Sequence, residues 1–393
     1  MINIDGSVGL GVNETETFKQ LCPDGHVTLN HVYQIYNRWF KFNNTDRIDV
    51  VLATALTQRH DGIPIWLILI APSGDGKSEQ IMAVHDGTTT KIIHEFTSRT
   101  LVSGSRNVQD LAPQLNNKIV LIPDMAQLLK LAPDEKARVW AQLRELYDGR
   151  AGRRTAMKED PDYSGLKITI IAGSTPAIDS QILIHQDLGT RELFYRIEET
   201  DKLEEKVWDD EGFETQMRKE LNWITTEFLK QHTIKEVDIS EDVRDKIFAY
   251  VDYLRYMRAV TETDSYTGEL INLVYPEKPT RCLKQLKKFF IALKSLDEKY
   301  TNETALRIIK DIVKSSSLPI RVKVLDHILA CNSSMTTNEI IKKVRIGTKT
   351  AVKELNILWH LNLINKDEVM DFTSYGKEYV KETNWSINRK KKL

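Results

Sequence analysis

Apolar side chains recur at intervals of three and four positions in the first part of the chain. This period extends over residues 30–42 and again over residues 46–58. Such spacing places the apolar groups along one face of an α-helix. The pattern therefore predicts two amphipathic helices. Residues 1–29 show little periodicity, and we expect an irregular lead-in there.

Three short and mostly apolar runs follow these helices. They cover Ile65–Ile70, Lys118–Ile122 and Lys167–Ala172, and β-branched side chains are frequent in them. Runs of this length are typical of strands that are buried on both faces of a parallel sheet. A helical pattern over Lys136–Tyr147 separates the second run from the third. Strands that alternate with helices predict an α/β fold with a parallel sheet.

The pattern becomes helical from residue 201 onward. Its clearest helices are expected over Val243–Met257 and Arg281–Leu296. The polar stretch Ser315–Pro319 ends in a helix breaker and predicts a linker or a domain boundary. A helical unit over 201–317 therefore follows the predicted α/β unit.

The segment 318–393 has an order of elements of its own. Helical patterns over Arg321–Ala330, Thr337–Val344 and Lys349–Leu361 precede an extended stretch over Asn362–Phe372. This is the order of a winged helix, whose third helix reads DNA. One side of that helix would carry Lys349, Thr350, Lys353 and Asn356. Winged helices also bind proteins, and a protein-contact module is the alternative.

Composition narrows the class of protein. Of 393 residues, 41% are hydrophobic and 28% are charged, which is typical of two or three globular units and excludes wholesale disorder. The longest apolar run, Ile63 to Ala71, is about half as long as a membrane-crossing helix, and we see no secretion signal. Cys22, Cys282 and Cys331 lack the spacing of a zinc site. We expect a cytoplasmic protein with reduced thiols and no membrane contact.

Charge is distributed unevenly along the chain. The formal net charge is −1, but residues from Leu318 onward include 14 Lys and Arg against 8 Asp and Glu, a net charge of +6. The block Arg389–Lys392 supplies part of this excess. A basic end on an acidic body favours contact with a polyanion such as DNA, although a solvated basic tail explains the same charges.

An octapeptide directly after the first apolar run has the pattern of a nucleotide-binding P-loop. Its residues are Ala71, Pro72, Ser73, Gly74, Asp75, Gly76, Lys77 and Ser78, with alanine in place of the usual first glycine. The two glycines allow successive backbone N–H groups to turn toward a phosphate. Lys77, expected to face solvent, reaches the β- and γ-phosphates, and the Ser78 hydroxyl binds Mg²⁺. The motif predicts ATP and Mg²⁺ binding, with a plain glycine-rich turn as the alternative.

A carboxylate stands at the end of the second predicted strand. P-loop enzymes use a carboxylate there to hold the magnesium shell or to orient water, and Asp124 occupies this position. It lies between Pro123 and Met125, so the usual acidic pair is absent and no separate general base is evident. The alternative is that Asp124 only caps a helix over Met125–Leu131.

Several segments resemble AAA+ ATPases, and more narrowly the helicase-like ATPases of phages, plasmids and integrative mobile elements that are related to minichromosome maintenance helicases. The segments that carry the resemblance are Val32–Phe40, Pro64–Leu67, Leu143–Arg150, Ala172–Asp179 and Leu188–Arg196. Together they extend the likeness over most of the chain from about His31 to Leu296. The resemblance implies an AAA+ core over 30–200, a helical lid over 201–317 and a winged-helix domain with a basic tail over 318–393.

The resemblance also implies roles for single residues. Thr175, beside Ser174, matches the sensor that contacts the γ-phosphate or the attacking water, although the usual asparagine is missing. Arg191 matches the arginine finger that acts on the nucleotide of a neighbouring subunit. Arg196 competes for that role, and a surface salt bridge is the alternative for Arg191. Arg281 matches a second sensor arginine that contacts the nucleotide, unless it belongs to a plain basic helix face.

A basic loop lies between the second and third predicted strands. In related helicases this stretch, Asp148–Lys158 here, forms a hairpin that projects into a central pore. Its candidate DNA contacts are Arg150, Arg153, Arg154 and Lys158. A solvated surface loop is the alternative, and Phe96–Thr100 is a weaker candidate for a second pore loop.

These features favour an ATP hydrolase that acts on DNA. The preferred hypothesis is an ATP-dependent DNA translocase or replicative helicase of a mobile genetic element, assembled as a homo-oligomeric ring, expected to be a hexamer. The alternative is a DNA-associated AAA+ switch without unwinding activity, such as a loader, a transposition regulator or a defence protein. A metabolite kinase is disfavoured because it needs neither an arginine finger nor a winged helix. No primase-like domain is recognisable, so a separate loader or primase is an expected partner.

Overall fold

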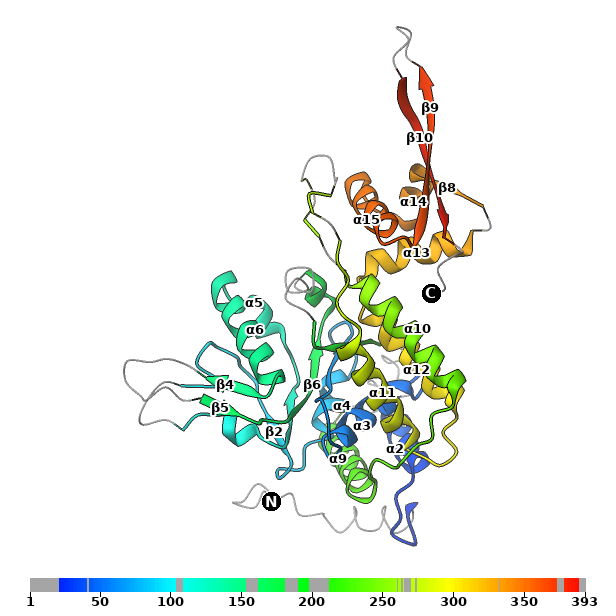
Figure 1. Cartoon of the computed structure of the whole chain (residues 1–393). Coiled ribbons are helices and arrows are strands. Elements are labelled where there is room, and N and C mark those ends of the chain that lie inside the picture. The colour runs from blue at the N-terminus through cyan, green and yellow to red at the C-terminus, as the bar shows by residue number, and fades with distance from the viewer. Residues whose placement is uncertain are drawn as a thin grey trace. The chain divides into compact units, whose positions relative to one another are not determined.

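The fold of the chain was obtained as a computed structural model (Figure 1). The residues that it describes are 21–40, 42–103, 109–152, 162–180, 190–197, 212–259, 261–262, 264, 270–272, 274–331, 333–372 and 378–388. Contacts between them divide the chain into two compact units. Unit 1 comprises Met1–Ile178, Arg191–Val243 and Lys284–Ile312, and unit 2 comprises Asp179–Thr190, Arg244–Leu283 and Val313–Leu393.

Unit 1 is built around a five-stranded sheet. Its strands are β1 (Trp66–Ile70), β2 (Thr90–Ile92), β3 (Lys118–Ile122), β6 (Ile168–Ser174) and β7 (Leu193–Arg196). Their order across the sheet is β2-β3-β6-β1-β7, and all neighbours pair in parallel. The predicted parallel α/β sheet is thus confirmed, and its central strands β1 and β6 are buried along their whole length. The short strands β2 and β7 were not among the predicted ones.

Helices cover this sheet (Figure 1). Those that lie within unit 1 are α2 (Leu29–Phe40), α3 (Asp46–Thr57), α4 (Lys77–Met82), α5 (Ala126–Lys130), α6 (Pro133–Tyr147) and α9 (Glu214–Gln231), with short 3₁₀ turns at Ala112–Leu115 and Pro176–Ile178. The helices predicted over 30–42, 46–58 and 136–147 are therefore confirmed. Every residue of α3 is buried, including three charged ones, because α3 packs against the sheet and α9. Tyr36 of α2 meets Thr225 of α9 through their hydroxyls at 3.1 Å.

The basic loop begins and ends in a pair of antiparallel strands. These are β4 (Arg150–Gly152) and β5 (Asp162–Ser164), with Arg150 opposite Ser164. Gly149, which precedes β4, has a φ of +79°, and a Cβ atom there would lie 3.0 Å from the carbonyl oxygen of Leu166. The antiparallel base of the predicted hairpin is confirmed, whereas its connecting residues 153–161 lie outside the described part of the chain.

Three long helices contribute to both units. They are α10 (Glu241–Met257), α11 (Thr280–Lys294) and α12 (Asn302–Ser315). The first two match the helices predicted over 243–257 and 281–296. No helix among the described residues is both long and apolar enough to cross a bilayer.

The C-terminal part of unit 2 combines three helices with a small sheet. Its elements are α13 (Pro319–Ala330), β8 (Met335–Thr336), α14 (Thr337–Val344), α15 (Thr348–His360), β9 (Ile364–Phe372) and β10 (Glu378–Ile387). The sheet has the order β8-β10-β9 with antiparallel pairing. Thr336 caps α14 and exchanges hydrogen bonds with Glu339, so the predicted helix start is confirmed.

The stretch Ser315–Pro319, predicted as a linker or domain boundary, lies inside unit 2, and its serines are buried. Ser316 and Ser317 are each only 1% exposed, and the Ser316 carbonyl oxygen accepts a hydrogen bond from buried Arg258. Buried Arg321 binds the Glu354 carboxylate at 2.7 Å and the Met257 carbonyl oxygen at 3.1 Å. The end of α10 therefore shares one hydrophobic core with the C-terminal helices.

Candidate functional site

The loop from Ala71 to Ser78 connects β1 to α4, at the carboxyl edge of the parallel sheet. Gly74 and Gly76 have φ values of +90° and +75°, a region that side chains other than glycine rarely enter. A Cβ atom on Gly76 would also lie 2.7 Å from the Phe40 ring. The loop is fastened to the neighbouring strand, because the Ala71 amide donates to the Ser174 carbonyl oxygen at 3.2 Å. Both glycines of the motif are thus required by the backbone.

The Lys77 side chain folds back over its own loop. Its ammonium donates to the Pro72 carbonyl oxygen at 3.0 Å, and the residue is only 6% exposed. The expectation that Lys77 faces solvent is therefore wrong. Burial lowers the pKa of Lys77, the carboxylates of Asp124 and Asp75 act in the opposite direction, and Arg47 lowers it further. The ammonium is held where a phosphate oxygen can replace the Pro72 carbonyl as its acceptor.

Ser78 and Asp124 lie where the Ala71–Ser78 loop, which we call the phosphate loop after the ligand it is proposed to bind, meets the end of β3. The Ser78 hydroxyl donates to the Pro123 carbonyl oxygen at 3.0 Å. Asp124 is exposed, and its carboxylate accepts a hydrogen bond from the Ala126 amide at 2.8 Å. The capping contact of the alternative interpretation is thus present. It engages only Oδ1, and the second carboxylate oxygen remains available to a cation beside Ser78.

The end of β6 lies between the ends of β1 and β3. Ser174 is paired in register with Ile70 and is fully buried, whereas Thr175 is half-buried. Gly173 allows the backbones to approach, because a Cβ atom there would lie 2.5 Å from the Pro123 carbonyl oxygen. The sheet therefore brings Lys77, Asp124 and Thr175 to one edge, as expected from their positions after parallel strands.

The donors of this edge suit a polyphosphate with a divalent cation. The amides from Gly74 to Ser78 donate no hydrogen bond to any group in the described part of the chain. Backbone amides that turn toward one point form an anion-binding concavity, and Lys77 adds a positive charge. Ser78 and Asp124 supply the hard oxygen ligands that Mg²⁺ prefers. No group of three or more His, Cys, Asp or Glu residues suited to a metal occurs among the described residues.

Arg47 is a residue of this site that the sequence analysis missed. Its buried guanidinium contacts the Ala71–Ser78 loop: it lies 2.9 Å from Asp75 Oδ2 and donates to the Asp75 carbonyl oxygen at 3.0 Å. The signal was available in the sequence, because Arg47 is a charged residue in a helix that is otherwise mostly apolar. Its partner lies 28 positions away, however, and no local pattern links the two.

Arg191 lies at the opposite edge of the sheet. Leu193 is in register with Leu67 of β1, so Arg191 lies level with Ile65. The phosphate loop begins about six residues further along β1, at Ala71, which corresponds to roughly 20 Å at the rise of a strand. Its guanidinium pairs with Asp148 at 2.7 Å, so the salt bridge of the alternative interpretation is present. Arg196 instead ends β7 in register with Ile70, at the edge of the phosphate loop.

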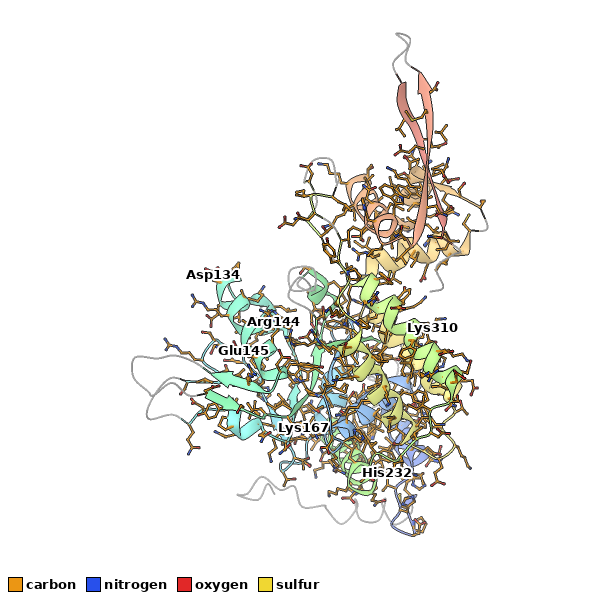
Figure 2. The ribbon with its side chains drawn as sticks, viewed as in Figure 1. Asp134, Arg144, Glu145, Lys167, His232 and Lys310 are labelled. Atoms are coloured by element: carbon orange, nitrogen blue, oxygen red, sulfur yellow. The ribbon has the colours of Figure 1, made fainter. Side chains whose placement is uncertain are left out.

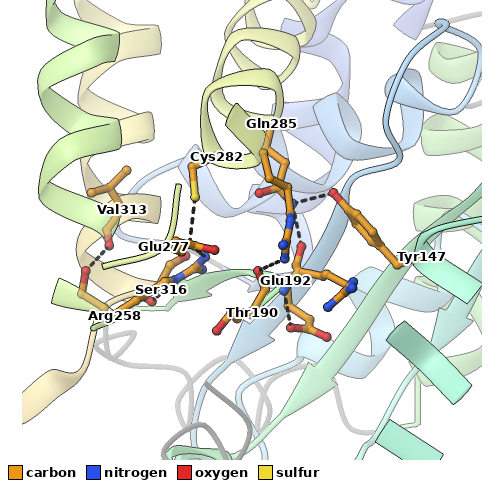
Figure 3. A network of polar contacts seen from close by, with 12 residues as sticks. Tyr147, Thr190, Glu192, Arg258, Glu277, Cys282, Gln285, Val313 and Ser316 are labelled. Carbon is orange, nitrogen blue, oxygen red and sulfur yellow. Dashed lines mark hydrogen bonds and ion pairs between the residues drawn. The ribbon is translucent and has the colours of Figure 1, made fainter. Parts of the chain in front are cut away.

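Two further contacts fix the surroundings of Arg191. Gln285 donates to the Tyr147 hydroxyl at 3.0 Å and to the Arg191 carbonyl oxygen at 2.6 Å (Figure 3). Arg144 lies on α6 (Figure 2), and burial together with the positive charge of Arg191 lowers its pKa. Gln285 thus holds the backbone of Arg191, and the charge of Arg191 lies close enough to Arg144 to lower the pKa of that residue.

Arg281, the predicted second sensor, makes its contact within unit 2. Its guanidinium donates to the Thr190 carbonyl oxygen at 3.1 Å (Figure 3). Of the lysines on the same helix, Lys288 is buried and donates to the carbonyl oxygens of His60 and Ile63 at 2.9 Å each. A role of Arg281 in nucleotide binding stays a prediction.

The candidate DNA contacts are placed in part. Arg150 is exposed on β4, whereas Arg153, Arg154 and Lys158 lie outside the described residues. On α15, Lys349 is exposed and Lys353 is half-buried. The opposite side of α15, including Leu355 and Leu358, lies in the core of unit 2. The helix face predicted to meet DNA is therefore the one turned away from the core.

No protein-family model matches this chain, and the comparison with curated proteins finds no significant relative.

Proposed function

We propose that the protein is an ATP hydrolase of the AAA+ type that acts on DNA as a translocase or replicative helicase. The observation that carries the proposal is the convergence of Lys77, Asp124 and Thr175 at the carboxyl edge of one parallel sheet. In an open α/β sheet, ligands bind outside the carboxyl ends of the strands. Position, charge and hydrogen-bond donors all suit a nucleoside triphosphate at this edge.

Each residue at this edge has a task in the proposed reaction. Lys77 and the amides from Gly74 to Ser78 bind the phosphates, with the Lys77 ammonium exchanging the Pro72 carbonyl oxygen for a phosphate oxygen. Ser78 and Asp124 hold Mg²⁺, which when bound neutralises charge on the phosphates. Thr175 offers a hydroxyl to the attacking water or to the γ-phosphate.

The place of Arg191 supports action on a neighbouring subunit. At roughly 20 Å from the level of its own phosphate loop, it cannot reach the nucleotide bound there. Asp148 and Gln285 hold it at the amino edge of the sheet, from which it would enter the site of a second copy. This arrangement favours a homo-oligomer with ATP at subunit interfaces, and a closed ring is the simplest head-to-tail assembly.

The C-terminal part of unit 2 supports a nucleic-acid partner. Its three helices followed by a strand pair have the order of a winged helix, so we assign α15 as the DNA-reading helix. Lys349 and Lys353 project from the face of α15 that the core leaves uncovered. Lysines in this arrangement bind backbone phosphates.

One observation favours the alternative of a switch that binds another protein. β9 and β10 carry five acidic residues, Asp367, Glu368, Asp371, Glu378 and Glu382, against two lysines. Val369 and Met370 are 43% and 47% exposed on the same hairpin. An acidic, partly apolar hairpin is a poor ligand for phosphates and suits a protein surface.

Assays of ATP turnover and strand displacement with the purified 393-residue protein distinguish these functions. We expect ATP turnover that needs Mg²⁺, rises with single-stranded DNA and drives strand displacement on a forked duplex. DNA-stimulated turnover without displacement would identify the switch. A folded protein that neither binds nor hydrolyses ATP would contradict the proposal as a whole.

A further inference from the structure

An acidic side chain stands inside the loop that is proposed to bind phosphates. Asp75 lies between Gly74 and Gly76, and its side chain is only 9% exposed. A buried carboxylate repels the anion that this loop is expected to receive, because the protein interior screens charges weakly. The loop can serve a polyphosphate only if the charge of Asp75 is compensated.

Arg47 supplies the compensating charge. One guanidinium nitrogen lies 2.9 Å from Asp75 Oδ2, and a second donates to the Asp75 backbone carbonyl oxygen at 3.0 Å. The Arg47 side chain is 3% exposed, so water screens this pair only slightly. The same guanidinium thus neutralises the side chain of Asp75 and fixes its backbone.

Neighbouring groups hold Arg47 in one geometry. Its Nε donates to Gln80 Oε1 at 3.0 Å, while the Gln80 amide returns a hydrogen bond to the Arg47 carbonyl oxygen at 2.5 Å. The guanidinium lies 4.0 Å from the centre of the Phe42 ring, which stacks on Phe40. Phe40 in turn contacts the loop at Gly76. Arg47 is therefore positioned by contacts from its own helix α3, from the first turn of α4 and from two aromatic rings.

We propose that Arg47 is a positioning residue of the nucleotide site, which cancels the charge of Asp75 and holds the phosphate loop in the shape that accepts a polyphosphate. This inference rests on the proposed ATP binding. Arg47 acts through Asp75 and the loop backbone and does not contact the nucleotide itself. The Arg47–Asp75 pair has a net charge of zero, so the charge of Asp75 no longer opposes the attraction of Lys77 for a phosphate.

A double-mutant cycle tests the proposal. We expect Arg47→Met to weaken the affinity for a fluorescent ATP analogue with Mg²⁺ by roughly 10- to 100-fold, because Asp75 is left unpaired in the phosphate loop. Asp75→Asn in the Arg47→Met background should restore the affinity to within about fivefold of the original protein, since no charge then opposes the ligand. The effect should appear in KM more than in kcat.

A matched control removes a different ion pair of the same helix. Arg307→Met separates the Arg307–Asp46 pair, which joins α12 to the residue next to Arg47 without touching the loop. It should leave nucleotide affinity unchanged. Thermal melting of each variant reports whether it folds.

The outcomes separate the inference from the function on which it rests. If the original protein binds the analogue, and folded Arg47→Met binds it equally well or Asp75→Asn fails to restore its affinity, Arg47 has only a structural role and the inference is wrong. If Arg47→Met does not fold, Arg47→Lys decides: retained affinity supports the charge argument, and lost affinity in a folded protein overturns it. An original protein that is folded and binds no nucleotide contradicts the proposed function, and the inference with it.

Discussion

Lys77 stabilises its own loop before any ligand is present, so its substitution has two separable effects. Lys77→Ala removes a charged hydrogen bond to the Pro72 carbonyl oxygen, worth about 1.5–3 kcal/mol, but it also removes the cost of burying the ammonium, so the net loss of folding free energy is smaller. A charged hydrogen bond to a phosphate is worth about 1.5–3 kcal/mol, or roughly 10- to 150-fold in rate. We expect ATP turnover to fall by at least this factor in a protein that melts only slightly earlier. Unchanged turnover in folded Lys77→Ala would contradict the P-loop assignment.

Gly173 is the residue on which the spacing of β3 and β6 depends. A Cβ atom there would lie 2.5 Å from the Pro123 carbonyl oxygen, so Gly173→Ala must push the two strand ends apart. Overpacking of this kind costs about 1–3 kcal/mol, and the shift moves Asp124 relative to Thr175. We expect lower stability in urea unfolding together with loss of turnover. Gly347→Ala is the control, because nothing lies within 4 Å of its added Cβ. Equal effects of the two substitutions would refute the steric argument.

Asp49 makes the stability of unit 1 depend on pH. Burial raises the pKa of Asp49 to about 7, against the opposing effect of hydrogen bonds from Tyr33 and Tyr300. Because the folded protein holds this proton above the pKa of the unfolded chain, the contribution of Asp49 to stability is complete below pH 4 and is lost as pH rises through 7.

Asp49→Asn measures this contribution, because asparagine does not titrate. The surrounding charges of Asp46 and Arg307 are the same in both proteins. We expect the free energy of unfolding of the original protein to fall by about 2 kcal/mol relative to Asp49→Asn between pH 5 and pH 7. Urea titrations at several pH values test this. Parallel pH profiles of the two proteins would show that Asp49 is ionised throughout.

Helix α15 and the β9–β10 hairpin have opposite charges, and only the helix suits DNA. We expect the double substitution of Lys349 and Lys353 by glutamine to weaken duplex binding and to lower the slope of affinity against salt by roughly 2, since each lost phosphate contact contributes about 0.9. Exposed Lys299 and Lys310 of unit 1 provide the matched control when replaced in the same way (Figure 2 shows Lys310). Fluorescence anisotropy across a salt titration is the measurement. If the slope of duplex affinity against salt does not change, α15 does not contact DNA and this part of unit 2 is assigned as a protein-binding module.

The β4–β5 hairpin is expected to couple DNA to hydrolysis rather than to supply affinity for duplexes. Replacing Arg150, Arg153, Arg154 and Lys158 by glutamine should abolish the stimulation of ATP turnover by single-stranded DNA and spare duplex binding. Lys130→Gln with Arg138→Gln, both exposed on α5 and α6, is the control for a general loss of positive charge. If single-stranded DNA still stimulates ATP turnover in the hairpin variant, the loop does not couple DNA to hydrolysis and is a solvated surface loop.

The assembled protein should show complementation between two inactive variants. Arg191→Ala lacks the group that a neighbour needs, and Lys77→Ala lacks the group that binds its own nucleotide. In a mixed oligomer, one interface combines an intact phosphate loop with an intact Arg191, so some turnover should return. Turnover is measured across mixing ratios after co-assembly has been verified. Two variants that co-assemble and stay inactive would show that Arg191 does not act on a neighbouring subunit.

Features that depend only on neighbouring residues could be predicted before the fold was known. The glycine pattern of Ala71–Ser78, the mostly apolar runs of β1, β3 and β6, and the start of a helix at Thr337 are local features. Each was predicted close to its observed position. Parallel strands also share an edge, so the meeting of Lys77, Asp124 and Thr175 followed from their positions after those strands. Strands β2 and β7 escaped prediction because three or four residues are too few to show a period.

Contacts between residues far apart in the sequence could be identified only in the folded chain. The pairing of β7 with β1 puts Arg196 level with Ile70, next to the Ala71–Ser78 loop, and leaves Arg191 before the opposite end of β7. The pairing of Arg47 with Asp75 joins a buried helix to a loop 28 positions away. The stretch Ser315–Pro319 is packed rather than exposed, because Arg258, 58 positions away from Ser316, donates a hydrogen bond to the Ser316 carbonyl oxygen. Hydrophobic periodicity reports which face of an element is buried, but it does not report what that face is buried against.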